Sequence, residues 1–299
     1  MKKLYILLTL FVLGYGAYFV ARQQDRKTDG FYVQRIASIF PDDPKWDIAT
    51  SQEQVDVANA ALNQPYTYLA HGFQCYAFIS QDKKYVLKFI RQQRLQPSVV
   101  IQWLPNISFF KTIKEEKALM GKRRAGYLFR SLKVAFEDVP EETGLLFVHL
   151  NKTKGIHPAV TIYDKAGGAF TVALDEHEFV LQKTALPIKE TISQLMKEGK
   201  VEAAKTRVAQ IFTLLERCAK KGIADMDNQL IRKNNLGFLP DSAIYIDTGK
   251  ITRKESIKTK PRFAKDLERL QPLYAWLEQN YPELALHFEA QQKIVLANF

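Results

Sequence analysis

Cysteine is scarce in this chain of 299 residues, and none of the five histidines has a metal-binding spacing. The two cysteines, Cys75 and Cys218, belong to no CxxC motif, which excludes a metal or redox site of that type. A single disulfide between them stays open, although we expect both to be small, partly buried side chains. The chain also lacks internal repeats and low-complexity tracts.

Acidic residues are fewer than basic ones, 32 against 43, so the formal net charge is +11. An excess of this size favours anionic partners such as phosphates, nucleic acid or acidic lipid. The sequence has no interleaved aromatic and basic repeat of the kind that stacks bases, so nucleic acid is not the expected partner. Hydrophobic residues make up 46% and charged residues 25%, which is typical of a folded chain with one large domain or two lobes.

Residues 4–21, "LYILLTLFVLGYGAYFVA", carry no charge. As a helix this run would be about 27 Å long, close to the thickness of a bilayer core. We therefore expect residues 1–27 to form an N-terminal transmembrane helix, which makes the protein a single-pass membrane protein. A cleaved signal peptide and a buried helix are the alternatives. Basic residues flank the run on both sides, so its orientation stays open. Residues 28–62 read as a polar tether with one short helix at 53–62.

Alternating and helical patterns predict an α+β fold, with a sheet-rich first half and a helical second half. Gly167-Gly168 predicts a hairpin turn, and Gly199 a break between two helices. The expected strands include 66–70, 76–80 and 85–90, and the expected helices include 110–136, 188–221, 263–280 and 284–295.

Two single residues in the first half could contact a phosphate. Lys88 lies within "YVLKFI", where it would be a fixed positive charge if that strand face lines a cleft. Gly72 lies between two strands and could let the backbone approach a ligand. An edge-strand lysine facing water and an ordinary hairpin glycine are the plain alternatives.

The segment 222–250 is the richest in polar side chains. Asp225 and Asp227 follow a helix that ends at Gly222, and a predicted hairpin brings Asn235 and Asp247 to the same open end. Mg²⁺ prefers one or two carboxylates together with substrate phosphates, and an asparagine and an aspartate oxygen would suit it. Asp227 could accept a proton from a hydroxyl. For Asp241, in a "PDSA" turn, we expect only turn chemistry.

The order of these motifs resembles a divergent bacterial member of the protein-kinase-like superfamily. Gly72 and Lys88 resemble the glycine loop and the nucleotide lysine, Asp227 the catalytic aspartate, Asn235 the metal-binding asparagine and Asp247-Thr248-Gly249 the metal-binding Asp-Phe-Gly. The resemblance implies a two-lobed fold with a β-rich N-lobe at 63–183 and a reduced helical C-lobe at 184–299, joined by a hinge at "EFVLQKTAL". It also implies ATP and Mg²⁺ as cofactors.

Several departures indicate an atypical member. Asp227 and Asn235 are eight residues apart where protein kinases use five, so an insertion at 230–233 should bulge outward, and Asn234 could be the ligand instead. Met226 replaces the usual arginine, Thr248 replaces the phenylalanine, and no Ala-Pro-Glu follows. These departures favour a small-molecule or bacterial kinase-like enzyme over a eukaryotic protein kinase.

The glutamate that pairs with Lys88 in the family is hard to assign here. Glu116 is our choice and Glu115 the alternative, although basic neighbours favour a solvated face. Basic residues also crowd the segment 250–265, which could gather an acidic or phosphorylated substrate or could simply be a solubilising or lipid-facing run.

By resemblance, the chain is expected to be a membrane-tethered phosphotransferase that moves the γ-phosphate of ATP to an unidentified hydroxyl. Lys88 would hold the α- and β-phosphates, Asn235 and Asp247 the metal, and Asp227 the acceptor hydroxyl. A catalytically inactive pseudokinase that acts as a binding module is the main alternative, and an unrelated lipid-surface adaptor is a third. An active kinase would face the cytoplasm, where ATP is abundant.

Overall fold

A seven-stranded sheet forms the first half of the molecule in this computed structural model, which describes residues 2–228, 230–231 and 235–299. The strand order is β4-β7-β3-β2-β1-β5-β6, and the β1–β5 pair is parallel. Its strands are β1 (Tyr66–His71), β2 (Cys75–Ser80), β3 (Tyr85–Ile90), β4 (Leu145–His149), β5 (Ala159–Tyr163), β6 (Ala169–Ala173) and β7 (Phe179–Lys183). The predicted β1–β2–β3 meander and the β5–β6 hairpin at Gly167 are confirmed.

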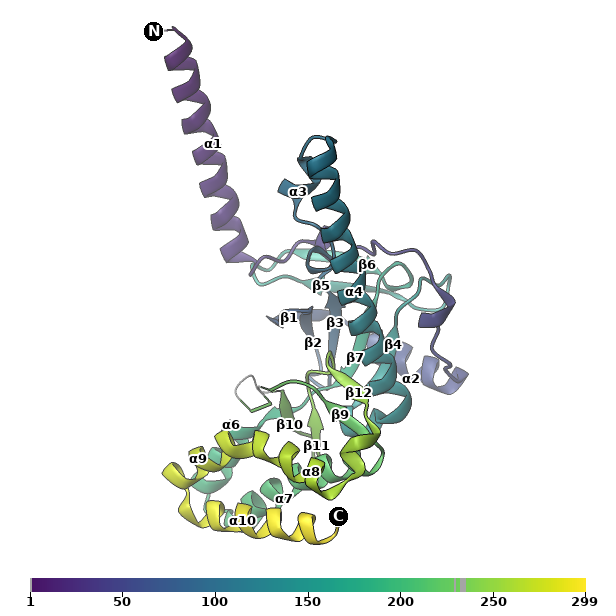
Figure 1. Ribbon diagram of the computed structural model, residues 1–299, viewed down its shortest axis with the longest axis vertical. Coiled ribbons are helices and arrows are strands. Elements are labelled where there is room, and N and C mark those ends of the chain that lie inside the picture. Colours follow the sequence, from purple (N-terminus) through teal and green to yellow (C-terminus); the bar gives the residue numbers. More distant parts are fainter. Residues whose placement is uncertain (1, 229, 232–234) are drawn as a thin grey trace.

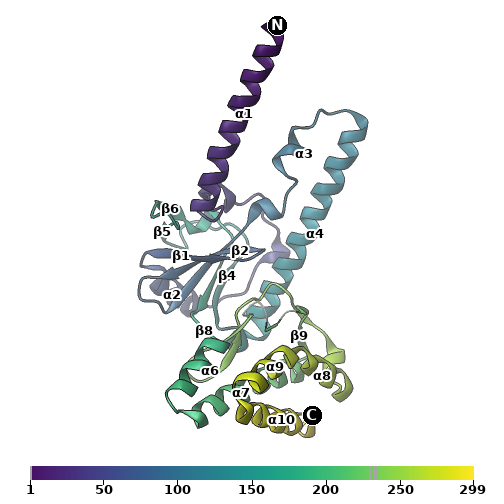
Figure 2. The same cartoon turned by 90° about the vertical axis from the view of Figure 1, so that its left-hand side faces the viewer.

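The chain then crosses to a second half that is mainly helical (Figures 1 and 2). The connection runs from β7 to β8, which pairs with β10 of a separate small sheet. The elements of this half are β8 (Leu186–Pro187), α6 (Ile188–Lys197), α7 (Val201–Lys220), β9 (Ile223–Asp225), β10 (Leu236–Phe238), β11 (Ala243–Tyr245), β12 (Ile251–Arg253), α8 (Lys260–Leu267), α9 (Gln271–Asn280) and α10 (Pro282–Ala297). The predicted α+β layout, including the helix break at Gly199, is therefore confirmed.

The helix α4 (Ser108–Asp138) links the two halves. In its C-terminal part, Leu128, Leu132, Ala135 and Phe136 form an apolar stripe that is buried in the larger core. Its N-terminal part extends away from the body of the molecule together with α3 (Val99–Trp103) (Figure 2). The short α5 (Pro140–Thr143) follows α4 and leads into β4. Short 3-10 turns complete the chain: η1 (Val33–Arg35), η2 (Pro44–Trp46), η3 (Gln92–Arg94), η4 (Leu174–Glu176), η5 (Glu255–Lys258) and η6 (Glu268–Leu270).

The two faces of the main sheet belong to different apolar cores. Leu87 and Phe89 of β3 pack into a core above the sheet, whereas Ile90 of the same strand packs into the larger core shared with α4 and the second half. Alternate residues of a strand point to opposite faces. Lys88 therefore shares the face of Ile90 and points toward the second half.

The segment 28–62 is packed more closely than a tether. Phe31 and Ile36 are fully buried in the core above the sheet, and Phe31 meets Tyr76 edge-on with ring centroids 5.2 Å apart. The predicted short helix exists as α2 (Gln52–Leu62) and begins at a capping box in which Ser51 and Gln54 bond each other's backbone. The proposed division into domains stays a prediction.

The predicted transmembrane helix is wrong. Residues 4–21 lie in the helix α1 (Lys2–Lys27), but within the part of the chain that the structure describes no helix is long and apolar enough to cross a membrane. The prediction relied on the length of the run and on its absence of charge. The single-pass membrane localisation fails with it.

Candidate active site

Lys88 lies at the junction between the sheet and the second half. Its ammonium donates a 2.6 Å hydrogen bond to the backbone carbonyl of Ile246, the residue before Asp247. Burial lowers the pKa of Lys88, and the nearby Asp247 carboxylate opposes that shift. The two residues, 159 positions apart in the sequence, are therefore electrostatic neighbours. Lys88 is not an edge-strand lysine, because β3 lies between β2 and β7.

The β10–β11 hairpin brings Asn235 next to Asp247, as the sequence predicts. Leu236 pairs with Tyr245, and the Asn235 carbonyl accepts hydrogen bonds from the backbone N–H groups of Ile246 at 2.7 Å and Asp247 at 3.4 Å. Asn235 is buried and Asp247 is exposed. The amide and the carboxylate thus start from adjacent positions at one end of the hairpin.

Asp227 is tied to this hairpin through its side chain. Its Oδ2 atom accepts a hydrogen bond from Asn235 Nδ2 at 3.1 Å and lies 3.2 Å from the ammonium of Lys250. Asp227 is 6% exposed. The predicted proton acceptor and the predicted metal-binding amide are therefore in direct contact.

A buried ion pair holds the backbone around Asp227. Arg269 donates to the Asp225 carboxylate at 2.9 Å and to the Asp227 carbonyl at 2.6 Å, and Asp225 accepts from the Asp227 N–H at 2.9 Å. Burial raises the pKa of Asp225 to about 6, although the charge of Arg269 opposes the shift. Sequence reasoning missed Arg269 because it lies on η6, far along the chain, with no motif around it.

Lys250 owes its position to a short two-stranded pairing. β9 and β12 are antiparallel, with Ile251 opposite Asp225, and Met226 N donates to the Lys250 carbonyl at 3.0 Å. This pairing places the residue after Asp247-Thr248-Gly249 beside the Asp227 loop. The sequence marks Lys250 only as the first of a basic run.

The insertion between Asp227 and Asn235 does not bulge outward at its start. Leu230 and Ile231 are buried in the larger core, and the Asn235 N–H donates to the Leu230 carbonyl at 3.2 Å. Both side chains are apolar, so their burial stabilises the inward conformation of this segment. The number of inserted residues alone had suggested an exposed bulge. The alternative ligand Asn234 lies outside the described residues.

The β1–β2 loop approaches Asp247-Thr248-Gly249 through Gln74 and not through Gly72. A Cβ atom at Gly249 would lie 1.7 Å from Gln74 Oε1, so glycine is required there unless the glutamine moves. Gly72 does not have a positive φ, and a Cβ built on it would meet no atom within 4 Å. The predicted approach of a ligand to the Gly72 backbone stays a prediction.

Glu116 does not reach Lys88. It lies exposed on the extending part of α4, and among the described residues no carboxylate lies within 4.0 Å of the Lys88 ammonium. Glu115 is exposed beside it. The α4 residue that contacts the Asp247 segment is Ser131, whose hydroxyl donates to the Thr248 carbonyl at 2.5 Å. Ser131 is about 22 Å further along the helix than Glu116.

The donor set near Asp247 fits Mg²⁺ better than it fits a transition metal. Among the residues that the structure describes, no three His, Cys, Asp or Glu side chains form a metal-binding group. Mg²⁺ does not need such a group, because it binds one or two protein oxygens and completes its shell with water and phosphate oxygens. Asn235 and Asp247 can supply those oxygens, while both cysteines are free thiols.

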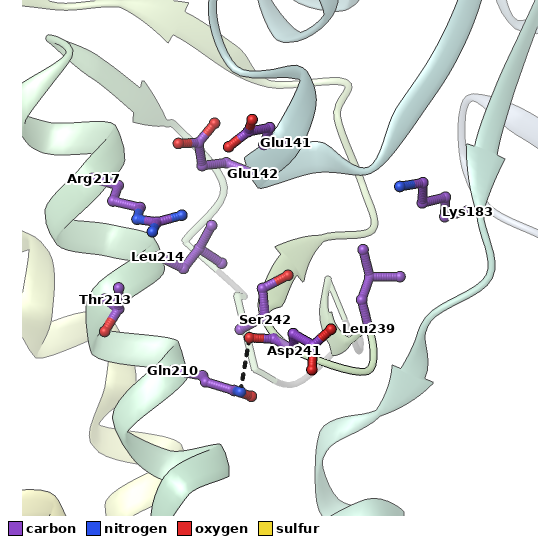
Figure 3. Close-up of a pocket in the computed structure, with 11 residues that line it drawn as sticks. Glu141, Glu142, Lys183, Gln210, Thr213, Leu214, Arg217, Leu239, Asp241 and Ser242 are labelled. Carbon is purple, nitrogen blue, oxygen red and sulfur yellow. Dashed lines mark hydrogen bonds between the residues drawn. The ribbon is translucent and has the colours of Figure 1, made fainter.

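Two cavities of small-molecule size are relevant here, and the first reaches the Asp247-Thr248-Gly249 segment. One, of about 790 Å³, lies between α4, the β1–β2 loop and β12 and reaches Gly249 and Lys250. The other, of about 360 Å³, lies between α5, α7 and the β10–β11 turn (Figure 3). Its lining includes Gln210, which donates to the Asp241 carbonyl at 3.0 Å.

Comparisons with known proteins give little. No protein-family model matches the chain, and no curated protein matches it. Among solved structures, the chain is similar to the bifunctional kinase-methyltransferase WbdD, with 16% sequence identity and a TM-score of 0.31. The match covers 74% of this chain and 43% of WbdD, so the chain spans less than half the length of that protein.

Proposed function

We propose that this protein is a kinase-like phosphotransferase that moves the γ-phosphate of ATP to a hydroxyl acceptor. The observation that carries the proposal is one connected set of contacts from four separate segments. Lys88 bonds the carbonyl of Ile246, Ile246 bonds the backbone of Asn235, and the amide of Asn235 bonds Asp227. A partly buried cation, an exposed carboxylate and a buried carboxylate thereby lie close together where two halves of the chain join.

Each residue has a role that its surroundings support. Lys88 would neutralise the α- and β-phosphates, and the low polarity around it strengthens that attraction. Asn235 and Asp247 would hold Mg²⁺, which when bound neutralises charge on the β- and γ-phosphates. Asp227 would orient the acceptor hydroxyl, since its carboxylate is fixed by Asn235 and its backbone by Arg269.

The transfer step is an in-line displacement. The acceptor oxygen forms a bond to the γ-phosphorus while the bond from that phosphorus to the β–γ bridging oxygen breaks, and ADP leaves with the electron pair. The hydroxyl proton passes to the Asp227 carboxylate. Lys250, 3.2 Å from that carboxylate, would stabilise negative charge on the transferring group.

A direct test combines binding and turnover. We expect ATP with Mg²⁺, but not ATP with EDTA, to raise the unfolding temperature of the purified protein, and we expect ADP release that Asp247→Ala abolishes. Asp241→Ala is the matched control, because Asp241 lies exposed in the turn of the same hairpin. Absence of both the thermal shift and ADP release in the natural protein would refute the proposal.

A pseudokinase is the second candidate, and one observation favours it. The Lys88 ammonium already bonds a backbone carbonyl and the Asp227 carboxylate already contacts Lys250, so both groups have partners inside the protein. A protein that binds ATP with Mg²⁺ but releases no ADP with any acceptor would be of this kind.

A further inference from the structure

The cavity between α4 and β12 is unusually basic. Its volume is about 790 Å³, within the range of small-molecule sites. Among the residues that the structure describes, its lining contains seven basic residues and no acidic residue. The seven are Arg94, Arg123, Arg124, Arg130, Lys250, Arg253 and Lys254.

Most of these charges have no carboxylate partner. Arg253 pairs with Asp138 at 2.6 Å, and Lys250 contacts Asp227. For the other five, no carboxylate lies within 4.0 Å among the residues that the structure describes. Uncompensated like charges around one hollow raise the local concentration of anions, and arginines bind phosphate through two parallel hydrogen bonds.

The same cavity is bordered by apolar side chains that are exposed to solvent. Phe73 is 63% exposed, Tyr127 77% and Met226 47%. The guanidinium of Arg94 lies over the Phe73 ring, 5.0 Å from its centroid. Exposed aromatic rings beside arginines suit a ligand that joins an anionic group to a flat or apolar group.

Two residues that line the cavity lie next to the proposed proton acceptor. Lys250 lines the cavity and also contacts the Asp227 carboxylate, and Met226, the neighbour of Asp227 in the chain, lines it too. Lys250 therefore joins the lining of the cavity to the Asp227 carboxylate. Lys88 is not part of the lining, so the proposed nucleotide lysine belongs to a different side of Asp247-Thr248-Gly249.

We infer that this cavity is the acceptor site, and that the acceptor is a small molecule carrying a phosphate group together with an apolar or aromatic group. The assignment of the ligand as acceptor rests on the proposed phosphotransferase function. Binding of such a molecule does not, which allows the two to be tested separately.

The test measures binding by calorimetry without ATP. The probes are phenyl phosphate, inorganic phosphate and benzyl alcohol, and we expect phenyl phosphate to bind tightest because it alone engages both kinds of lining. The variant Arg123→Gln/Arg124→Gln should raise its Kd about tenfold or more, since charge-assisted hydrogen bonds are lost. Lys111→Gln/Lys117→Gln removes the same charge from exposed positions of α4 outside the cavity and should leave the Kd unchanged.

Each outcome decides the matter. Equal binding to both double variants, or displacement of phenyl phosphate by ATP with Mg²⁺, would overturn the site. If the probe binds as expected but ADP release never depends on any phosphorylated alcohol, the acceptor assignment falls. Two acceptors distinguish a lipid headgroup from a free metabolite as the source of the phosphate. They are a soluble short-chain phosphatidylglycerol and a sugar phosphate. Faster ADP release with either one supports the inference.

Discussion

The cavity beside α4 and the cavity of Figure 3 differ in the charge of their linings as well as in size. The cavity beside α4 has seven basic side chains and no acidic one, whereas the cavity of Figure 3 mixes Glu141, Glu142 and Asp241 with Lys183 and Arg217. Of these, the buried Glu142 already has a partner, since Lys221 donates to both of its oxygens at 2.8 and 2.9 Å. Uncompensated charges of one sign around a hollow raise the local concentration of ions of the opposite sign.

The difference also follows the proposed chemistry. Lys250, which lines the basic cavity, contacts Asp227, and no residue that lines the cavity of Figure 3 is among the proposed site residues. If the comparison holds, changes on the Asp227 side should affect transfer strongly, and changes around the other cavity should not.

The largest effect is expected for Asp227→Asn. Loss of the proton acceptor should lower the rate of ADP release by about 10³-fold, within the range for general base catalysis. The variant keeps the size of the side chain, and its binding of phenyl phosphate should be unchanged. Steady-state kinetics and calorimetry check both. A rate within threefold of the natural protein would remove Asp227 from the mechanism.

Lys88→Met should reduce transfer by about 100-fold, because a buried cation contributes strongly to phosphate binding in a medium of low polarity. The thermal shift with ATP and Mg²⁺ should also disappear. The variant keeps the aliphatic stem and avoids a buried charge, so the unfolding temperature without ligand should stay within a few degrees. An intact thermal shift would show that ATP does not contact this residue.

The predictions that rested on local sequence patterns were confirmed most fully. The hairpin that joins Asn235 to Asp247 follows from two short strands and a turn, and Lys88 follows from alternation within one strand. The sequence analysis missed contacts between residues that are far apart in the chain. Only the C-terminal part of the long α4 packs on the core. Ser131, and not Glu116, therefore contacts the Asp247 segment. Arg269 contacts Asp225 across 44 residues, a contact that no pattern in a single sequence reveals.

A smaller effect concerns pH and tests whether the Arg269 clamp positions Asp227. The folded-state pKa of Asp225, about 6, lies above its ordinary value near 4, so the folded protein binds more protons than the unfolded chain between these values. The contribution of Asp225 to stability is therefore full below about pH 4 and is lost as the pH rises through about 6.

Asp225→Asn should flatten the pH dependence of the unfolding free energy across that window, as measured in urea from pH 4 to 8. Transfer by the natural protein should rise several-fold from pH 5 to 7, because the charged carboxylate strengthens its bond to Arg269. Asp227 and Asp247 are the other charged groups that act on Asp225, so Asp241→Asn, at an exposed turn position that does not act on Asp225, serves as the control for stability. Identical slopes for the natural protein and the Asp225 variant would exclude this residue as the source.

The smallest effect is expected at the cavity of Figure 3. Arg217→Gln removes one exposed positive charge from its lining and should change neither the rate of transfer nor the Kd for phenyl phosphate by more than about twofold, because salt screens an exposed charge and Arg217 does not line the basic cavity. Arg130→Gln, the matched change in the basic cavity, should raise that Kd several-fold under the same conditions. Equal sensitivity of the two arginines would mean that net charge of the whole molecule, and not the local lining, attracts the anion.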